Sequence, residues 1–256
     1  MSRLLLDIGN SRLKWALAEG ERLLTWGVVE HRGQQLHSLL ERELPLASDP
    51  GPVWISNVAG TAMQRALRRW ARERQGRALR FVRSSAQAHG VINAYEEPEQ
   101  LGSDRWLALL AARREHGRAL CVFDSGSAIT VDGLLADGRH VGGAIMPGHE
   151  AMVHALRVST HLTALPVQAV ATPWGTNTAA CIDAGIRHAV LGLLRGFMER
   201  LAQQAGETPL CLVTGGGGQA WLPWLQEIPH RYCPDLVLQG LAIVSANDHE
   251  TSLDDD

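Results

Sequence analysis

Two stretches of this chain carry the same order of apolar and polar positions. Near the start, residues 4–9 form an apolar run that ends in an acidic glycine turn, and near the middle residues 121–126 form another. After each come a strand pattern, a tight polar turn and a second strand pattern, with the tight turns at residues 18–21 and 136–139. Because both stretches have the order strand, acidic glycine turn, strand, tight turn, strand, the sequence predicts an internal duplication.

Strand and helix signals alternate after the first repeat. Residues 53–58 and 79–82 have the composition of short strands. Between them, Met63, Ala66, Leu67 and Trp70 recur at helical spacing. Residues 105–116 form an apolar-rich helix pattern that Gly117 closes. This alternation is typical of an α/β layer fold.

The second half continues in the same way. A long helix is predicted from about residue 178 to residue 205, and a strand at residues 210–214. We therefore predict two α/β domains, residues 1–117 and 118–247. The final segment, residues 248–256, is acidic and without periodicity, so we expect it to be a disordered tail.

Composition narrows the classes of partner. The formal net charge is −3 and both signs are scattered along the chain, which argues against nucleic acid as a partner. The arginine-rich stretch at residues 65–74 is best explained as the solvated face of an amphipathic helix. No apolar run is long enough to cross a membrane, and Asp7 and Gly9 interrupt the opening one, so no export signal is expected.

The four cysteines, at positions 121, 181, 211 and 233, show no close paired spacing. We expect buried, reduced thiols, which suit a reducing compartment. Together with the lack of an export signal, this predicts a cytoplasmic protein.

The two acidic glycine turns suggest phosphate binding. A strand that ends in Asp and turns through Gly presents a carboxylate and backbone N–H groups to one point, which suits a phosphate with its magnesium ion. A single such turn is an ordinary structural feature, but two copies in duplicated settings favour function. Lys14, the only lysine, stands just beyond the first turn, where its charge could meet phosphate oxygens. No P-loop motif is present in the sequence.

A third glycine element, residues 214–218, follows an apolar strand. It could receive an adenosine face or a phosphate, or it could be a flexible loop. It also matches a loose dinucleotide fingerprint through Gly215, Gly217 and Ala220, with Asp235 at a suitable distance. We reject the fingerprint because prolines at 229 and 234 break the strand that should deliver Asp235, and too little chain follows to complete a dinucleotide domain.

Asp104 stands at the start of an otherwise apolar helix pattern. It could be an ordinary N-cap residue. Alternatively, it could accept a hydroxyl proton during phosphoryl transfer, because a helix N-terminus would keep its carboxylate ionised. Local sequence leaves both interpretations open.

The motifs together resemble those of type III pantothenate kinases, members of the actin-like and sugar-kinase-like ATPase superfamily. The resemblance covers nearly the whole chain. It is carried by residues 7–11, Tyr95 with residues 101–105, residues 124–130, residues 142–148 and residues 177–178. It implies an α/β fold of two duplicated ribonuclease H-like, actin-like ATPase domains with a nucleotide cleft between them.

The resemblance also implies roles for individual residues. ATP, with Mg²⁺, would be bound by Asp7, Ile8, Gly9, Asn10, Ser11, Arg12, Leu13, Lys14 and Ser127. Asp124 would bind a monovalent cation, potassium or ammonium. Pantothenate would be contacted by Tyr95, Gly102, Ser103, Asp104, Arg105 and Thr178, with Asp104 as the proton acceptor. Thr178 begins the long predicted helix, where free N–H groups favour a substrate carboxylate. Ser11 and Ser127 stand where many relatives carry threonine, and either hydroxyl can donate to a phosphate.

The implied activity is ATP-dependent phosphorylation of pantothenate to 4′-phosphopantothenate, the first step toward coenzyme A, by a homodimer. Two alternatives stay open at the level of sequence. One is a non-enzymatic regulatory protein, because the chain also resembles the Bvg accessory factor group. The other is a kinase of the same superfamily with a different acceptor.

Overall fold

A computed structural model describes residues 2–32, 36–44, 51–73, 78–160 and 172–247. The chain forms two compact units. The first comprises residues 1–117, 137–142 and 235–256, and the second comprises residues 118–136 and 143–234. A domain boundary after Gly117 stays a prediction, and the acidic tail lies outside the described residues. Residues 235–246 group with the first unit although they follow the second along the chain.

The first unit is built on a mixed sheet whose five described strands have the order β3-β2-β1-β4-β5. They are β1 (Arg3–Ile8), β2 (Arg12–Glu19), β3 (Arg22–Glu30), β4 (Val53–Asn57) and β5 (Leu79–Phe81). β1 runs antiparallel to β2 and parallel to β4. The strands β1, β2, β3, β4 and β5 are elements that the apolar pattern predicted, whereas the parallel pairing of β1 with β4 comes from the structure.

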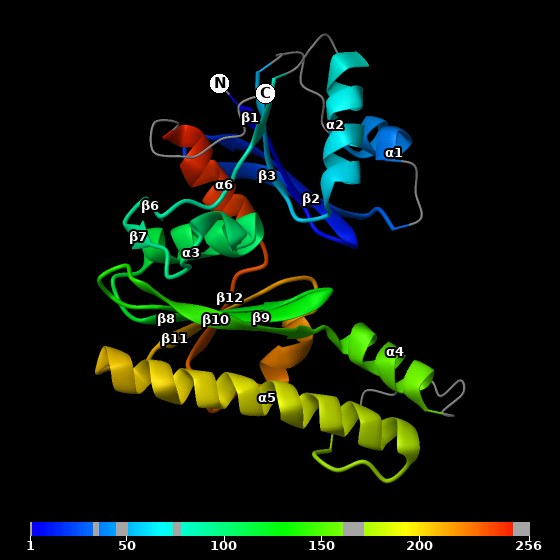
Figure 1. The fold of residues 1–256 in the computed structure, drawn as a ribbon, viewed down its shortest axis with the longest axis vertical. Helices are drawn as coiled ribbons and strands as arrows, with labels where there is room; N and C mark the ends of the chain where they lie inside the picture. The colour runs from blue at the N-terminus through cyan, green and yellow to red at the C-terminus, as the bar shows by residue number, and fades with distance from the viewer. Residues whose placement is uncertain (1, 33–35, 45–50, 74–77, 161–171, 248–256) are drawn as a thin grey trace. The chain divides into compact units, whose positions relative to one another are not determined.

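Helices cover both faces of this sheet (Figure 1). One face packs against α1 (Leu36–Glu43) and α2 (Thr61–Glu73), where Leu6, Ile8, Leu67 and Trp70 share a core. The other face packs against α6 (Leu236–Ala246), which in turn packs against α3 (Ser103–Glu115). Since successive strand residues alternate between faces, Leu5 and Asp7 lie on the α6 side.

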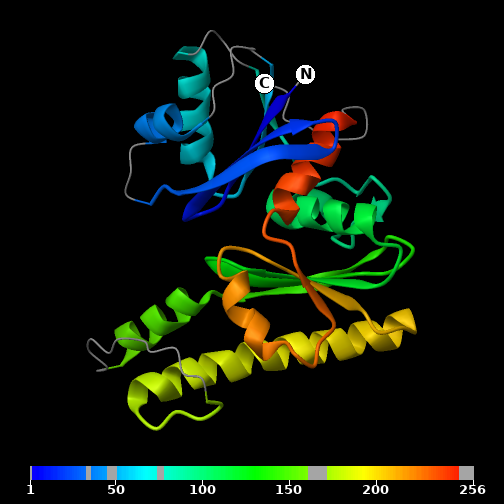
Figure 2. The ribbon, with the colours of Figure 1, turned by 180° about the vertical axis from the view of Figure 1, so that it is seen from behind.

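The second unit, drawn with the first in Figure 2, repeats the strand arrangement of the first sheet. Its described sheet has the order β10-β9-β8-β11-β12. The strands are β8 (Leu120–Ser125), β9 (Ala128–Leu134), β10 (His140–Pro147), β11 (Leu210–Thr214) and β12 (His230–Tyr232). β8 runs antiparallel to β9 and parallel to β11, as β1 does to β2 and β4. The identical strand order confirms the predicted duplication.

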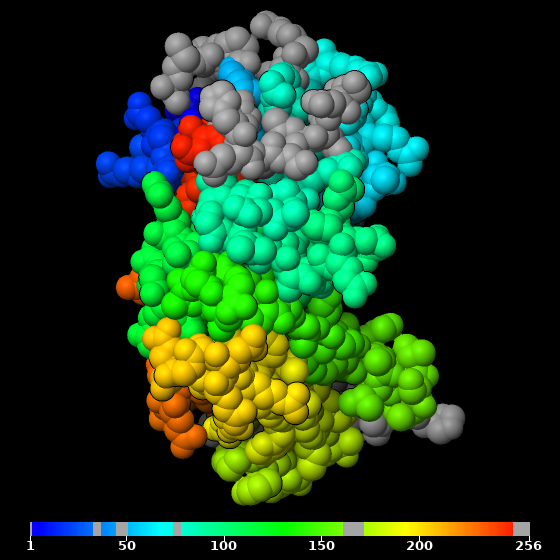
Figure 3. Space-filling model, turned by 60° about the vertical axis from the view of Figure 1, so that its left-hand side comes forward, coloured from blue at the N-terminus to red at the C-terminus, as the bar shows by residue number. Residues whose placement is uncertain are grey.

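Among its described residues, the second unit has two α-helices, α4 (His149–Ser159) and α5 (Thr178–Ala205). α5 packs on β8 and β9, and its other side lies at the surface, as the yellow atoms in Figure 3 show. Its bounds agree with the predicted long helix. Asn177 caps its start, and Gly206 ends it with φ +71°.

Smaller elements complete the chain. A short hairpin consists of β6 (Gln87–Ala88) and β7 (Val91–Ile92). Two 3-10 helices span Pro98–Gln100 and Gly218–Trp224. The described residues contain no helix long and apolar enough to span a bilayer.

The cysteines only partly match their prediction. All four are free thiols, and three are buried, but Cys181 is exposed. The expectation that it is buried is wrong because position 181 lies on the solvent side of the first turn of α5. Cys121 is paired in register with Cys211, and the hydrogen bond between these thiols, together with burial, raises the pKa of Cys121 well above its usual value. It is therefore a poor nucleophile.

Candidate active site

The first acidic turn lies at the end of β1. Asp7 is paired in register with Lys14 on β2 and with Ser56 on β4. Paired residues on neighbouring strands point to the same face of a sheet, so these three polar side chains form a row across it. Asp7 is only 8% exposed. A buried carboxylate beside a lysine and a hydroxyl is a suitable start for a site that binds phosphate with a metal ion.

The turn itself is held by the backbone and by one histidine. Gly9 N donates to the carbonyl oxygen of Arg12 at 3.0 Å, which closes the turn and exposes Asn10. His31, just after β3, lies with its Nε2 2.8 Å from the carbonyl oxygen of Gly9, and its backbone N donates to the carbonyl oxygen of Ser11 at 3.1 Å. No local pattern predicted a role for His31, because this contact spans more than twenty residues of chain.

The start of α3 shows that Asp104 is not its N-cap residue. Gly102 occupies the N-cap position, and Asp104 is the second residue of the helix. The N-cap interpretation of Asp104 is therefore wrong. A Cβ at Gly102 would lie 2.7 Å from Asp104 Oδ1, so a side chain there would displace the carboxylate from its place over the helix start. In this position Oδ1 accepts a hydrogen bond from Arg105 N at 2.8 Å.

A hydrogen bond connects this helix start to β4, the strand beside Asp7. Ser103 Oγ lies 3.0 Å from Ser56 Oγ, and Ser56 is the register neighbour of Asp7. The predicted ATP residue Asp7 and the predicted base Asp104 thus belong to one unit, with the Ser56–Ser103 pair between their elements.

Tyr95 and Arg105 complete the predicted acceptor group. Arg105 is 8% exposed, and its Nη1 donates to the Tyr95 hydroxyl oxygen at 2.8 Å. Asn93 shapes the loop that carries Tyr95: its Oδ1 accepts from Tyr95 N at 3.1 Å, and its Nδ2 donates to the carbonyl oxygens of Ser85 and Pro98. The structure therefore brings Tyr95, Asp104 and Arg105 together. Sequence reasoning missed Asn93, whose side chain acts as a local turn former.

The second acidic turn repeats the layout of the first. Asp124 on β8 is paired in register with Thr130 on β9 and with Thr214 on β11. Gly126 N donates to the carbonyl oxygen of Ala128 at 2.9 Å, as Gly9 does to Arg12 in the first turn. Ser127 is exposed at the tip. The two turns thus present a carboxylate at equivalent positions of equivalent sheets.

The third glycine element packs directly against the second turn. Gly215 has φ +86°, and a Cβ there would lie 2.4 Å from both Asp124 Oδ1 and the carbonyl oxygen of Ser125. Gly217 N donates to the same carbonyl oxygen at 2.8 Å, and Trp221 Nε1 donates to Ser125 Oγ at 2.9 Å. The third glycine element therefore packs closely against the second turn, and it does not form a dinucleotide-binding turn. Asp235, which that fingerprint would require after a strand, instead precedes α6 as its N-cap residue.

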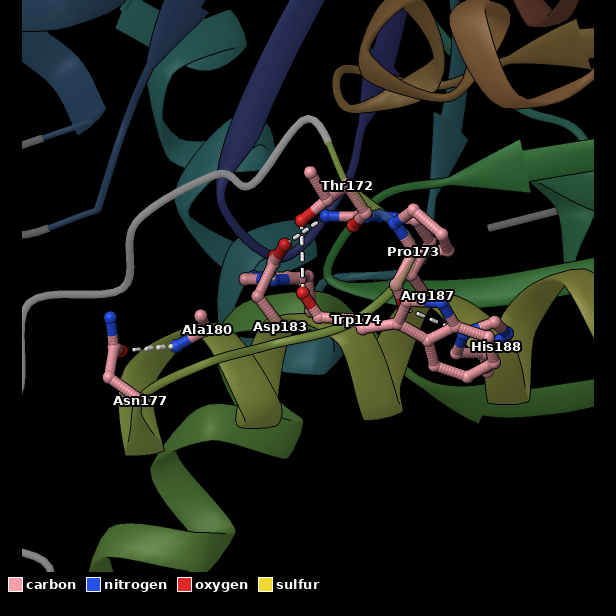
Figure 4. Close-up of polar contacts among 9 residues, drawn as sticks. Thr172, Pro173, Trp174, Asn177, Ala180, Asp183, Arg187 and His188 are labelled. Atoms are coloured by element: carbon pink, nitrogen blue, oxygen red, sulfur yellow. Dashed lines mark hydrogen bonds and ion pairs between the residues drawn. The ribbon is translucent and has the colours of Figure 1, made fainter.

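The start of α5 is fixed by its cap and by the segment before it (Figure 4). Asn177 Oδ1 accepts from Ala180 N at 3.0 Å, while Thr178 is exposed at the first helical position. Farther along the helix, Arg187 pairs with Asp183 and donates to the carbonyl oxygen of Thr172 at 3.2 Å. This buried pair, which sequence reasoning missed, anchors the segment that leads to Thr178.

Comparisons with known proteins decide the family. A model of the family described as type III pantothenate kinase matches residues 3–200. The chain belongs to the type III pantothenate kinase family. Among curated members, the type III pantothenate kinase of Azoarcus sp. is 38% identical, with 96% of this chain and 91% of that protein covered. That of Nitrosococcus oceani is 33% identical, with 98% of each chain covered.

Solved structures support the fold of this pantothenate kinase family member. A candidate Baf family transcriptional activator from Campylobacter jejuni matches with a TM-score of 0.60 and 20% identity, covering 96% of this chain and 98% of that one. A candidate 2-dehydro-3-deoxygalactonokinase from Sinorhizobium meliloti matches with a TM-score of 0.56 and 14% identity, covering 99% and 98%. At these identities the likeness concerns the fold alone. The predicted α/β fold of two duplicated domains is confirmed.

Proposed function

We propose that the chain transfers the γ-phosphoryl group of ATP to the primary hydroxyl of pantothenate, which gives 4′-phosphopantothenate, the first intermediate toward coenzyme A. Family membership supports this reaction. The structural observation that carries the proposal is the cluster of Asp104, Arg105 and Tyr95 at the start of α3, tied by Ser103 to the strand beside Asp7.

Asp104 is the proposed general base. Its carboxylate accepts the hydroxyl proton as the acceptor oxygen attacks the γ-phosphorus, and the bond from that phosphorus to the leaving ADP oxygen breaks. Two features support this role. The N-terminal end of α3 stabilises negative charge, and the hydrogen bond from Arg105 N stabilises the ionised form. Arg105 and Tyr95, with Gly102 and Ser103 of the same turn, would contact the acceptor.

The first turn is the proposed binding site for ATP and Mg²⁺. Asp7 is a hard oxygen ligand of the kind that Mg²⁺ prefers, directly or through water, and Lys14 beside it supplies a point charge for phosphate oxygens. The remaining contacts would come from residues 8–13. When bound, the metal ion neutralises developing phosphate charge. The residues present fit such a group because a carboxylate, an ammonium and a hydroxyl lie in one row.

The second turn is the proposed site of a monovalent cation, potassium or ammonium. Thr214 Oγ1 is fully buried and has no hydrogen-bond partner among the described residues, and its residue is the register neighbour of Asp124. An orphaned hydroxyl oxygen beside a carboxylate fits a cation that oxygen atoms coordinate. Within the described ranges no three His, Cys, Asp or Glu side chains form a metal site, so the other ligands would be hydroxyls, carbonyls or water. Ser127, at the tip of the turn, would contact ATP.

Thr178 is the proposed contact for the pantothenate carboxylate. It lies exposed at the first position of a long helix, where N–H groups attract anions. The family resemblance further supports a homodimer, and the use of ATP supports a cytoplasmic location.

An Asp104→Asn variant tests the role of the base. The amide keeps an oxygen that can accept from Arg105 N, so we expect an unchanged fold, but it cannot take a proton. Turnover should fall by about 10²–10⁴-fold, as for loss of a general base. Asp235→Asn is the matched control, because Asp235 also stands at a helix start and makes no side-chain cap bond. Turnover of Asp104→Asn equal to that of the control would defeat the assignment.

A further inference from the structure

A buried histidine lies behind the acceptor residues. His140, the first residue of β10, is 4% exposed and belongs to the first compact unit, with residues 137–142. Its ring stacks on the Tyr95 ring, with 6.2 Å between the centroids and 14° between the planes. Its Nδ1 lies 3.4 Å from Ala94 N, which donates to it. His140 thus contacts both the backbone and the side chain of the loop that carries Tyr95.

The turn that presents His140 is rigidly docked. Ile92 N donates to the carbonyl oxygen of Gly138 at 2.9 Å. Gly138 has φ +92°, and a Cβ there would lie 1.9 Å from the carbonyl oxygen of Gly90, so no other residue fits. Asp137 accepts from both Arg139 N and Arg139 Nε, which fixes the turn from inside. A histidine on such a support has little freedom to move.

These contacts form one series from His140 to the proposed base. The His140 ring stacks on the Tyr95 ring, and the Tyr95 hydroxyl oxygen accepts a hydrogen bond from Arg105 Nη1 at 2.8 Å. The backbone N of the same Arg105 donates to Asp104 Oδ1. Tyr95 is partly exposed, whereas His140 and Arg105, which both contact it, are buried. The side chain proposed to contact the acceptor, Tyr95, is therefore oriented by His140, which does not contact the acceptor.

We propose that His140 is a positioning residue for the acceptor: it fixes the Tyr95 ring and, through the Tyr95 hydroxyl, the Arg105 guanidinium. The inference rests on the proposed acceptor site above. Because His140 acts on acceptor contacts and not on the proton transfer, its loss raises the KM for pantothenate while kcat and the KM for ATP change little. A rise in KM with an unchanged kcat is the signature of a lost contact that substrate and transition state make equally.

Three variants separate the contacts of the ring. His140→Ala removes both, His140→Phe keeps an aromatic ring for Tyr95, and His140→Asn keeps an oxygen that can accept from Ala94 N. We expect the KM for pantothenate to rise about tenfold in His140→Ala, the order expected when one acceptor hydrogen bond is lost. His140→Phe should keep the KM for pantothenate close to that of the unchanged protein, whereas His140→Asn should raise it almost as much as His140→Ala does. His230→Ala is the control, since His230 lies on β12 and contacts the carbonyl oxygen of Ile228.

The same substitutions in a Tyr95→Ala background test the coupling. His140→Ala should add no further rise in KM there, because its effect passes through Tyr95. An equal rise in both backgrounds would overturn the inference, as would a rise in KM for Tyr95→Ala with none for His140→Ala. No change in Tyr95→Ala itself would overturn the proposed acceptor site and the inference with it. If His140→Ala does not fold, the ranking of Phe above Asn in affinity decides, and the reverse ranking contradicts the proposal.

Discussion

Gly215→Ala perturbs the second turn without removing a polar group. Gly215 has φ +86°, which costs an L-residue about 1–2 kcal/mol. The added methyl would also lie 2.4 Å from Asp124 Oδ1 and from the carbonyl oxygen of Ser125, and relief of such overpacking costs about 1–3 kcal/mol. The free energy of unfolding should therefore fall by about 2–5 kcal/mol in urea titrations.

The same variant tests the proposed cation site. The Asp124 side chain yields more easily than the Ser125 backbone, so the carboxylate should be displaced. A loss of about 1.4 kcal/mol in cation binding raises the potassium concentration for half-maximal turnover tenfold, and we expect at least about that shift.

Gly185→Ala is the matched control for both measurements. Nothing lies within 4 Å of a Cβ at this exposed position of α5, so alanine should be neutral or stabilising by up to about 1 kcal/mol. An unchanged urea midpoint for Gly215→Ala would refute the packing argument. A lower midpoint with an unchanged potassium requirement would refute the placement of the cation at Asp124.

Two further changes have expected outcomes. Asn177→Ala removes the acceptor for Ala180 N at the start of α5 and should lower the free energy of unfolding by about 1 kcal/mol, whereas Asn177→Asp should keep it; equal loss in both variants would contradict the cap. Burial alone would raise the pKa of Glu21, but hydrogen bonds from Arg114 and Asn247 bring it below its ordinary value of 4.5. The ionised Glu21 therefore stabilises the fold above that value, and this contribution is lost as pH falls through the lowered pKa. Urea titrations of Glu21→Gln should thus show a deficit at pH 7 that shrinks near pH 3, and a constant deficit would count against the ion pair.

The parts of the fold that local sequence specifies were predictable. Asp7 and Asp124 were recognisable because a strand, an acid and a glycine stand adjacent in sequence, and the repeat of this order predicted two equivalent sheets. The long helix was predicted from about residue 178 to residue 205, and the structure agrees: Asn177 caps the start of α5, and Gly206 ends it with a φ of +71° that suits glycine.

Contacts between distant segments were not predictable. His31 contacts Gly9 across 22 residues of chain, and His140 contacts Ala94 across 46. Trp221 contacts Ser125 across 96 residues. No local pattern marks such pairs, because each depends on how the strands are ordered. The buried pair of Asp183 and Arg187 has helical spacing, but its burial depends on the segment that crosses it.

The N-cap interpretation of Asp104 failed for a local reason. Capping preferences favour Asp and Ser over Gly, which placed the helix start too late. The structure begins α3 at Ser103 with Gly102 as the cap, and the Asp104 carboxylate lies close to the space that a side chain at position 102 would take.

The most direct test of the central claim is the product that the purified chain forms from ATP and pantothenate with magnesium and potassium, identified by mass spectrometry. We predict 4′-phosphopantothenate in equal amounts with ADP, and about 10²–10⁴-fold slower formation by Asp104→Asn. Nucleotide binding without this product, or transfer to another alcohol in a panel of acceptors while pantothenate stays unmodified, would contradict the account.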